Sequence, residues 1–212
     1  EELKNMIRED TILVSVIAVD SEIGLKQPIE EIGEILKDYP NTFFHTDASQ
    51  AIGKVDIDLT NVDLMTIAPH KFYGINGFGA LIKKKDIGLV PIINGGKSTT
   101  IYRSGTPVLA MVVALDKALE IAYSKMNERY EYIKGLNNRV KDALSKYDNV
   151  HIISTDNSVP HTLNIAIDNI KSLDFAKKLE DFDVFISTKT SCCPSETPSK
   201  LVYAITNDKK LR

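Results

Sequence analysis

Apolar and polar positions alternate in short blocks along the first half of the chain, and this pattern predicts an α/β sheet. Residues 11–19 (TILVSVIAV) form an apolar run rich in β-branched side chains, which is typical of a strand buried on both faces. Further strands are expected at residues 42–45, 62–67 and 79–83. A helix is expected after Gln27-Pro28, with Ile29, Ile32 and Leu36 on one face. Strand and helix in this order favour a sheet with parallel members.

From Pro107 the apolar positions follow a helical period. They recur at helical spacing over residues 108–122 and 127–147, as is usual for helices that pack one face into a core. The remainder predicts short strands at residues 150–154, 162–167 and 184–187, a helix capped by Ser172 and a last helix starting at Pro198-Ser199. We therefore expect two domains, residues 1–125 and residues 126–212.

Composition narrows the class of protein. The 212 residues are 43% hydrophobic and carry a net charge of −3, so strong attraction to nucleic acid or to an anionic membrane is not expected. No apolar run reaches the roughly 18 residues of a transmembrane helix. The start on Glu1, inside a helix-like stretch, predicts a fragment without a signal peptide. The two cysteines are adjacent, Cys192 and Cys193, which predicts a reducing compartment such as the cytoplasm.

Two polar segments follow predicted strands and are candidates for chemistry. Residues 45–50 read HTDASQ, and residues 69–74 read PHKFYG. Ligands of open α/β sheets collect at the carboxyl ends of strands, so both segments are expected in one pocket. The spacing alone fits equally well with an Asp47 that caps a helix and a Lys71 on the surface. A lysine in a partly desolvated pocket can form an imine, because a fraction of it stays neutral and nucleophilic.

The two segments resemble the cofactor signature of cysteine desulfurases, which are class V aminotransferase-like enzymes of fold-type I. This resemblance implies an α/β large domain with a mostly parallel sheet, followed by a small α+β domain at the carboxyl end. It implies pyridoxal 5'-phosphate as the cofactor. In the family pattern, Asp47 pairs with the pyridine nitrogen and Gln50 contacts the phenolic oxygen. His70 then matches a phosphate contact and Lys71 the Schiff-base lysine.

Other segments match the same family in register. Residues 19–24 (VDSEIG) resemble its V-N-N-E-I-G turn, in which Ser21 takes a cofactor-contacting position that is asparagine in the family. Residues 94–96 and 103–106 resemble its G-G…R-S-G-T segment, which implies that Thr106 reaches the cofactor phosphate of the partner subunit in a homodimer. Ala68 departs from the serine that often contacts the phosphate.

The stretch at residues 187–193 resembles the loop that carries the attacking cysteine in desulfurases. Alignment from the preceding strand places the nucleophile at Cys192, and alignment from Pro198 leaves Cys193 open. The resemblance implies that sulfur leaves L-cysteine as a persulfide on this residue, gives L-alanine, and passes to a sulfur-acceptor protein for iron–sulfur cluster assembly or tRNA thiolation. No metal is implied.

The residues leave three alternatives open. The same cofactor residues serve selenocysteine lyases and other class V lyases. A non-catalytic domain that keeps only a dimer or partner interface is a third alternative. Family members also carry a long segment ahead of the position of Glu1 and a substrate-binding arginine beyond that of Arg212, so the resemblance implies a chain that is incomplete at both ends.

Overall fold

The computed structural model describes residues 2–96, 100–188 and 199–205. The chain divides into two compact units, which we describe one at a time. The first consists of Glu1–Val19 and Gln27–Met126, and the second of Asp20–Lys26 and Asn127–Arg212. In the described parts of the chain, no helix is long and apolar enough to cross a membrane.

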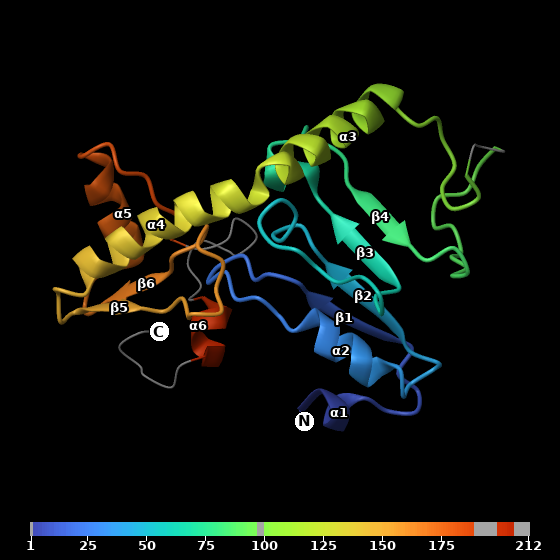
Figure 1. Cartoon of the computed structure of the whole chain (residues 1–212), viewed down its shortest axis with the longest axis horizontal. Helices are drawn as coiled ribbons and strands as arrows, with labels where there is room; N and C mark the ends of the chain where they lie inside the picture. Colours follow the sequence, from blue (N-terminus) through green and yellow to red (C-terminus); the bar gives the residue numbers. More distant parts are fainter. Residues whose placement is uncertain (1, 97–99, 189–198, 206–212) are drawn as a thin grey trace. The chain divides into compact units, whose positions relative to one another are not determined.

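The first unit is built on a four-stranded mixed sheet (Figure 1). Its strands are, in spatial order, β1 (Leu13–Ile17), β2 (Phe43–Asp47), β3 (Leu64–Ile67) and β4 (Ala80–Lys83). The first three are parallel, and β4 runs antiparallel to β3. The register places Ser15 beside His45 and Asp47 beside Thr66. The expected α/β fold with a mostly parallel sheet is therefore confirmed for this unit.

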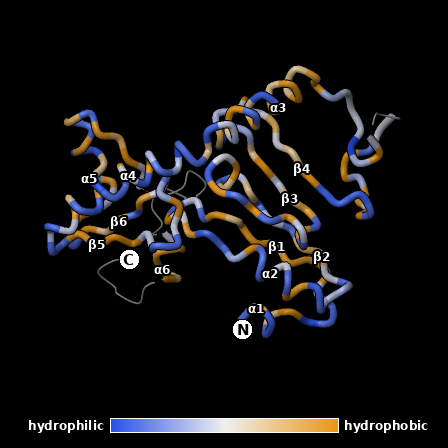
Figure 2. The backbone as a smooth tube through the Cα atoms, viewed as in Figure 1, coloured by the Kyte–Doolittle hydropathy of each residue, from blue (hydrophilic) through white to orange (hydrophobic). Residues whose placement is uncertain are grey.

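One face of this sheet is buried and the other is open. Phe44 and Thr46 of β2 are 1% and 0% exposed, and helix α2 (Ile29–Leu36) contacts β2. Helix α2 buries the apolar face that the sequence predicted, and its first turn carries two glutamates that favour the positive end of the helix dipole. Figure 2 shows the hydrophobic character of β1 and β3.

The prediction that residues 11–19 form a strand buried on both faces is wrong. Leu13 and Ile17 of β1 are 48% and 42% exposed, and Phe43, which pairs with Leu13, is 47% exposed. These side chains lie on the face of the sheet opposite to Phe44. Phe43 belongs to the interior strand β2 and is equally exposed, so the open face, rather than the composition of β1, accounts for the exposure.

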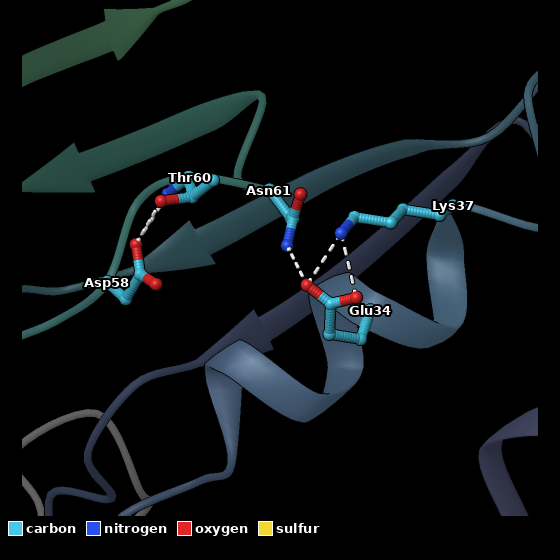
Figure 3. A network of polar contacts seen from close by, with 5 residues as sticks. All are labelled: Glu34, Lys37, Asp58, Thr60 and Asn61. Atoms are coloured by element: carbon cyan, nitrogen blue, oxygen red, sulfur yellow. Dashed lines mark hydrogen bonds and ion pairs between the residues drawn. The ribbon is translucent and has the colours of Figure 1, made fainter.

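A polar network ties α2 to the connection between β2 and β3 (Figure 3). Glu34 Oε1 accepts hydrogen bonds from Lys37 Nζ at 2.7 Å and from Asn61 Nδ2 at 2.8 Å. These two bonds, Lys37 first, lower the pKa of the Glu34 carboxyl. Gly33 permits the approach, because a Cβ there would lie 2.6 Å from Asn61 Cβ. The helix is thereby fixed along the loop that leads into β3.

The first unit contains two further helices, α1 (Glu2–Met6) near its start and α3 (Leu109–Ser124) near its end. It also contains the 3-10 turn η1 (Pro69–Phe72), which follows β3. The second unit contains most of α4 (Met126–Leu144) and a two-stranded antiparallel sheet of β5 (Val150–Ile152) and β6 (Ile165–Ile167). Helices α5 (Ser172–Glu180) and α6 (Lys200–Ile205) complete its described elements.

The segment Asp20–Lys26 is built into the second unit. Asp20 is buried, and its Oδ1 accepts the N–H groups of Glu22 and Ile23 at 2.7 and 2.8 Å. Gly24 has a φ of +72°, and its carbonyl accepts the N–H of Val159 at 2.8 Å. Ser154 Oγ donates to the Ile23 carbonyl at 3.0 Å. The turn that resembles V-N-N-E-I-G is thus held by residues far along the chain.

Two predictions for the end of the chain are wrong. Ser172 is the first residue of α5, the capping position is Lys171, and no side chain caps that end. Residues 184–187 form no strand. After α5 the chain turns through Asp183, at a φ of +58°, and the N–H of Val184 closes the helix by donating to the Leu179 carbonyl at 3.1 Å. The backbone of Val184 is therefore engaged in ending the helix, so it is not free to join a sheet ladder.

Candidate functional site

The two segments that sequence analysis singled out lie at one edge of the sheet. Asp47 is the last residue of β2, and Lys71 follows the end of β3 by four positions. The strands are parallel, and the Ala48 N–H donates to the Thr66 carbonyl at 2.9 Å just beyond the end of β2. The carboxyl ends of adjacent parallel strands therefore deliver both segments to the same edge, where α/β sheets bind ligands.

The turn after β2 is anchored by small apolar side chains. Ala48 and Ala51 are both 0% exposed, and the N–H groups of Ala51 and Ile52 donate to the Ala48 carbonyl at 2.9 and 3.0 Å. Asp47 Oδ1 accepts the N–H of Ser49 at 2.9 Å, which fixes the orientation of its carboxylate. This single bond is a local turn contact rather than a helix cap.

Gln50 and a lysine that sequence analysis missed are paired in this turn. Lys54 Nζ donates a hydrogen bond to Gln50 Oε1 at 3.0 Å. Burial lowers the pKa of Lys54, and the nearby positive charge of Lys71 lowers it further. Gln50 and Lys54 thus form a hydrogen-bonded pair at the sheet edge, within reach of the charge of Lys71. The only signal for Lys54 in the sequence is its position four residues after Gln50, which is the spacing of side-chain neighbours on one turn of helix.

Two buried apolar residues anchor the turn that carries Lys71. Pro69 and Phe72 of η1 are buried, whereas His70 and Lys71 between them are exposed. The N–H of Lys71 donates to the Ala68 carbonyl at 3.0 Å, and that of Gly74 to the Pro69 carbonyl at 2.8 Å. Because the backbone is fixed at both ends of the turn, the Lys71 side chain starts from a defined position.

Helix α3 packs against both turns at this edge of the sheet. It contacts η1, and Ala122 packs so closely on the turn after β2 that a Cβ at Gly53 would lie 2.8 Å from Ala122 Cβ. Burial raises the pKa of the neighbouring Tyr123, and Asp56 adds to the shift. Gly53 also has a φ of +71°, which side chains other than glycine rarely adopt. The position of Gln50 and Lys54 therefore depends on a glycine at this point.

We expect Gly53→Ala to lower the free energy of unfolding by about 2–4 kcal/mol, because it adds an overlap with α3 to the strain of a positive φ. The measurement is denaturant unfolding. Gly77→Ala is the matched control, since Gly77 has a φ of +95° but nothing within 4 Å of its added Cβ. It is expected to cost only about 1–2 kcal/mol. Equal losses in the two variants would mean that α3 does not press on the turn.

The other predicted site residues belong to other segments of the chain. Thr106 is exposed in the connection between β4 and α3, directly after Gly105 at a φ of +114°. Ser21 is exposed in the turn that belongs to the second unit. Cys192 and Cys193 lie outside the described residues. Among the described residues, no group of three or more potential metal ligands comes together.

The site offers three kinds of polar group along one edge. Asp47 supplies a carboxylate, Gln50 an amide and Lys71 an exposed amine. In the described part of the chain, Asp47 Oδ2 accepts no hydrogen bond, so it can take a donor from a ligand. The carboxylate can accept hydrogen bonds, the amide can donate them, and a neutral amine can attack a carbonyl carbon.

Comparison with known proteins gives consistent matches over nearly the whole chain. The family described as Aminotransferase class-V matches residues 1–206. The chain is 37% identical to the NifS/IcsS protein homolog of Lactobacillus delbrueckii subsp. bulgaricus, covering 98% of this chain and 56% of that protein. It is 36% identical to cysteine desulfurase IscS of Clostridium botulinum, covering 97% and 53%. The chain spans about half the length of the curated relatives it matches.

Solved structures agree with this similarity. A structure described as a NifS-like protein superposes with a TM-score of 0.83 at 32% identity, covering 89% of this chain and 52% of that one. A structure described as SspA in complex with cysteine superposes with a TM-score of 0.78 at 29% identity, covering 99% and 59%. The sheet that carries the candidate site therefore has the architecture of these proteins.

Proposed function

Because the chain belongs to the aminotransferase class-V family, we propose that the protein containing it is a cysteine desulfurase that uses pyridoxal 5'-phosphate. The observation that carries this proposal is the placement of Asp47, Gln50 and Lys71 at the carboxyl ends of β2 and β3. Similarity to curated proteins named cysteine desulfurase supports the substrate class. The whole protein is expected to be about twice the length of this chain.

The residues of the first unit suit the cofactor. Asp47 would face the ring nitrogen, and its orientation is already set by the Ser49 N–H. Gln50 would donate to the phenolic oxygen, His70 would contact the phosphate, and Lys71 would hold the aldehyde. We further propose that Thr106 contacts the phosphate of a partner subunit in a homodimer and that Ser21 adds a cofactor contact. When bound, pyridoxal 5'-phosphate supplies an electron sink for the substrate's α-carbon.

Lys71 and the cysteine pair divide the chemistry between them. The Lys71 amine removes the proton from the α-carbon of L-cysteine and holds it for return to carbon. The Cys192 thiolate attacks the substrate sulfur, so a sulfur–sulfur bond forms while the bond between sulfur and the β-carbon breaks. The electron pair of the broken bond stays with carbon, which takes up a proton and leaves as L-alanine. A persulfide remains on Cys192, with Cys193 as the alternative position.

The remaining parts of the proposal concern the setting of this reaction. The second unit would correspond to part of a small α+β domain that carries the cysteine loop, as the sequence predicted for residues 126–212. A sulfur-acceptor protein would take the persulfide for iron–sulfur assembly or tRNA thiolation. A reducing compartment such as the cytoplasm suits a reactive thiolate. Curated relatives with mitosomal and mitochondrial names show that related chains occur in other compartments as well.

The test uses the full-length protein that contains this chain. After addition of pyridoxal 5'-phosphate we expect a visible absorption band that borohydride abolishes, and equal yields of sulfide and L-alanine from L-cysteine in the presence of thiol. Alanine release from selenocysteine but not from cysteine would assign a selenocysteine lyase instead. A protein that stays colourless with added cofactor would contradict the proposal and leave a non-catalytic domain.

A further inference from the structure

The contact between Lys54 and Gln50 is not used by the reaction proposed above. Lys54 Nζ lies 3.0 Å from Gln50 Oε1, and both side chains are partly buried. A lysine ammonium carries three donors and no acceptor, whereas a glutamine amide accepts through its oxygen and donates through its nitrogen. Lys54 can therefore bind only Oε1. The Nε2 group of Gln50 must then be turned to the other side of the amide.

We propose that Lys54 is a positioning residue that fixes the Gln50 amide with its N–H donors directed at the cofactor. The inference rests on the proposed function, because it gives Gln50 a donor role toward an anionic oxygen of the bound cofactor. Without Lys54 the amide is free to turn over and present Oε1. Two oxygen lone pairs would then oppose each other, and the cofactor would lose a hydrogen bond.

The backbone around Gln50 and Lys54 is held in place by hydrogen bonds and packing. The N–H of Lys54 donates to the Ala51 carbonyl at 2.9 Å, and Ala51 itself is fully buried. Gly53, packed on Ala122, fixes the step just before Lys54. Both ends of the Gln50–Lys54 pair are thus attached to a turn that is held by the core. The backbone entropy cost of placing the two residues side by side is therefore met by the fold, and only the side chains remain to be ordered when the bond forms.

The positive charge of Lys54 strengthens its hydrogen bond to Gln50. Burial and the positive charge of Lys71 both lower the pKa of Lys54, so an ammonium here is kept at a cost. A hydrogen bond from a charged donor is about twice as strong as a neutral one and offsets part of this cost. In the described residues no other side chain hydrogen-bonds to Gln50, so Lys54 alone sets the direction of its amide.

The first test compares Lys54→Met with Lys54→Arg in the full-length protein. Methionine keeps the buried stem but removes the donor, whereas arginine keeps a charged donor. We expect Lys54→Met to weaken binding of pyridoxal 5'-phosphate roughly tenfold and to lower the visible band relative to the near-ultraviolet band. Lys54→Arg is expected to restore both. Unchanged affinity and spectrum in Lys54→Met would overturn the proposal.

A double-mutant cycle then asks whether Lys54 acts through Gln50. In a Gln50→Ala background, Lys54→Met is expected to change neither the affinity nor the ratio of the two bands any further. The same tenfold loss in both backgrounds would show that Lys54 acts on the cofactor or on Lys71 directly, and the positioning role would be wrong.

A measurement on the cofactor-free protein separates this inference from the proposed function. The side-chain amide signals of Gln50, assigned by their loss in Gln50→Ala, are expected to shift in Lys54→Met and to keep their positions in Lys54→Arg. If the wild-type protein binds no cofactor, the proposed function fails, and these signals still decide whether Lys54 holds the amide. Signals that stay in place in Lys54→Met would contradict the inference on their own.

Discussion

Lys71→Ala is expected to abolish the visible, borohydride-sensitive absorption of the full-length protein and to lower the rate of alanine release from L-cysteine by at least about 10³-fold. Lys71 has two tasks in the proposed reaction, since it holds the cofactor aldehyde and moves the α-proton. Its exposed amine on the fixed turn of η1 is placed for both. Absorbance spectra and single-turnover alanine release measure the two effects separately.

The control for this prediction is Lys85→Ala. Lys85 is an exposed lysine that follows β4, outside the candidate site, and its loss is expected to change neither measurement. Free methylamine offers a second check, because it can replace part of the missing amine function in the alanine variant. A Lys71→Ala protein that keeps a borohydride-sensitive band would show that another lysine holds the cofactor, and Lys54 would be the first to test.

Cys192→Ala is expected to lower sulfide release from L-cysteine by roughly 10³-fold or more while leaving the cofactor band and its affinity intact. The thiolate acts only after the substrate has bound, so its removal stops sulfur transfer without touching the cofactor contacts of Asp47 and Gln50. The matched control is Cys193→Ala, which removes an adjacent thiol. We expect this variant to keep its activity within a few fold.

The pair of variants also decides between the two cysteines. Trapping the enzyme-bound persulfide with an alkylating reagent, followed by peptide mass analysis, locates the transferred sulfur directly. Sulfur found on Cys193, together with an active Cys192→Ala protein, would move the nucleophile by one residue. Full activity in the variant that lacks both thiols would contradict nucleophilic sulfur transfer by this loop.

Much of the first unit could be predicted from the sequence because its elements are short, regular and locally encoded. The β-branched run at Leu13–Ile17 and the apolar face of α2 are signals that a sheet and its covering helix both require. Burial of a strand depends on its neighbours as well as on its own residues. The sequence therefore predicts the position of β1 but does not predict that two of its apolar side chains are exposed.

The candidate site was predictable to the extent that strand ends locate it. Asp47 is the last residue of β2, and Lys71 lies in the turn after β3, so their common edge is a consequence of parallel pairing. Lys54 was not predicted, because a lysine four residues after Gln50 is usually a solvated side chain, and only the buried turn shows otherwise. The strand expected at residues 184–187 failed because apolar composition does not reveal that a backbone N–H is used to end α5.

The turn Asp20–Lys26 imposes an order on how the chain can fold. Its partners lie far downstream: Ser154 donates to Ile23 across 131 positions, and Asn164 donates to Glu22 across 142. Contacts of such high sequence separation form late, because the intervening loop must close first. During synthesis, α2 and β2 can meet soon after they emerge, while the turn that precedes α2 waits for the rest of the polypeptide. The two units are therefore not independent folding modules. The second unit is fully formed only when the segment Asp20–Lys26, from the first half of the chain, has packed into it.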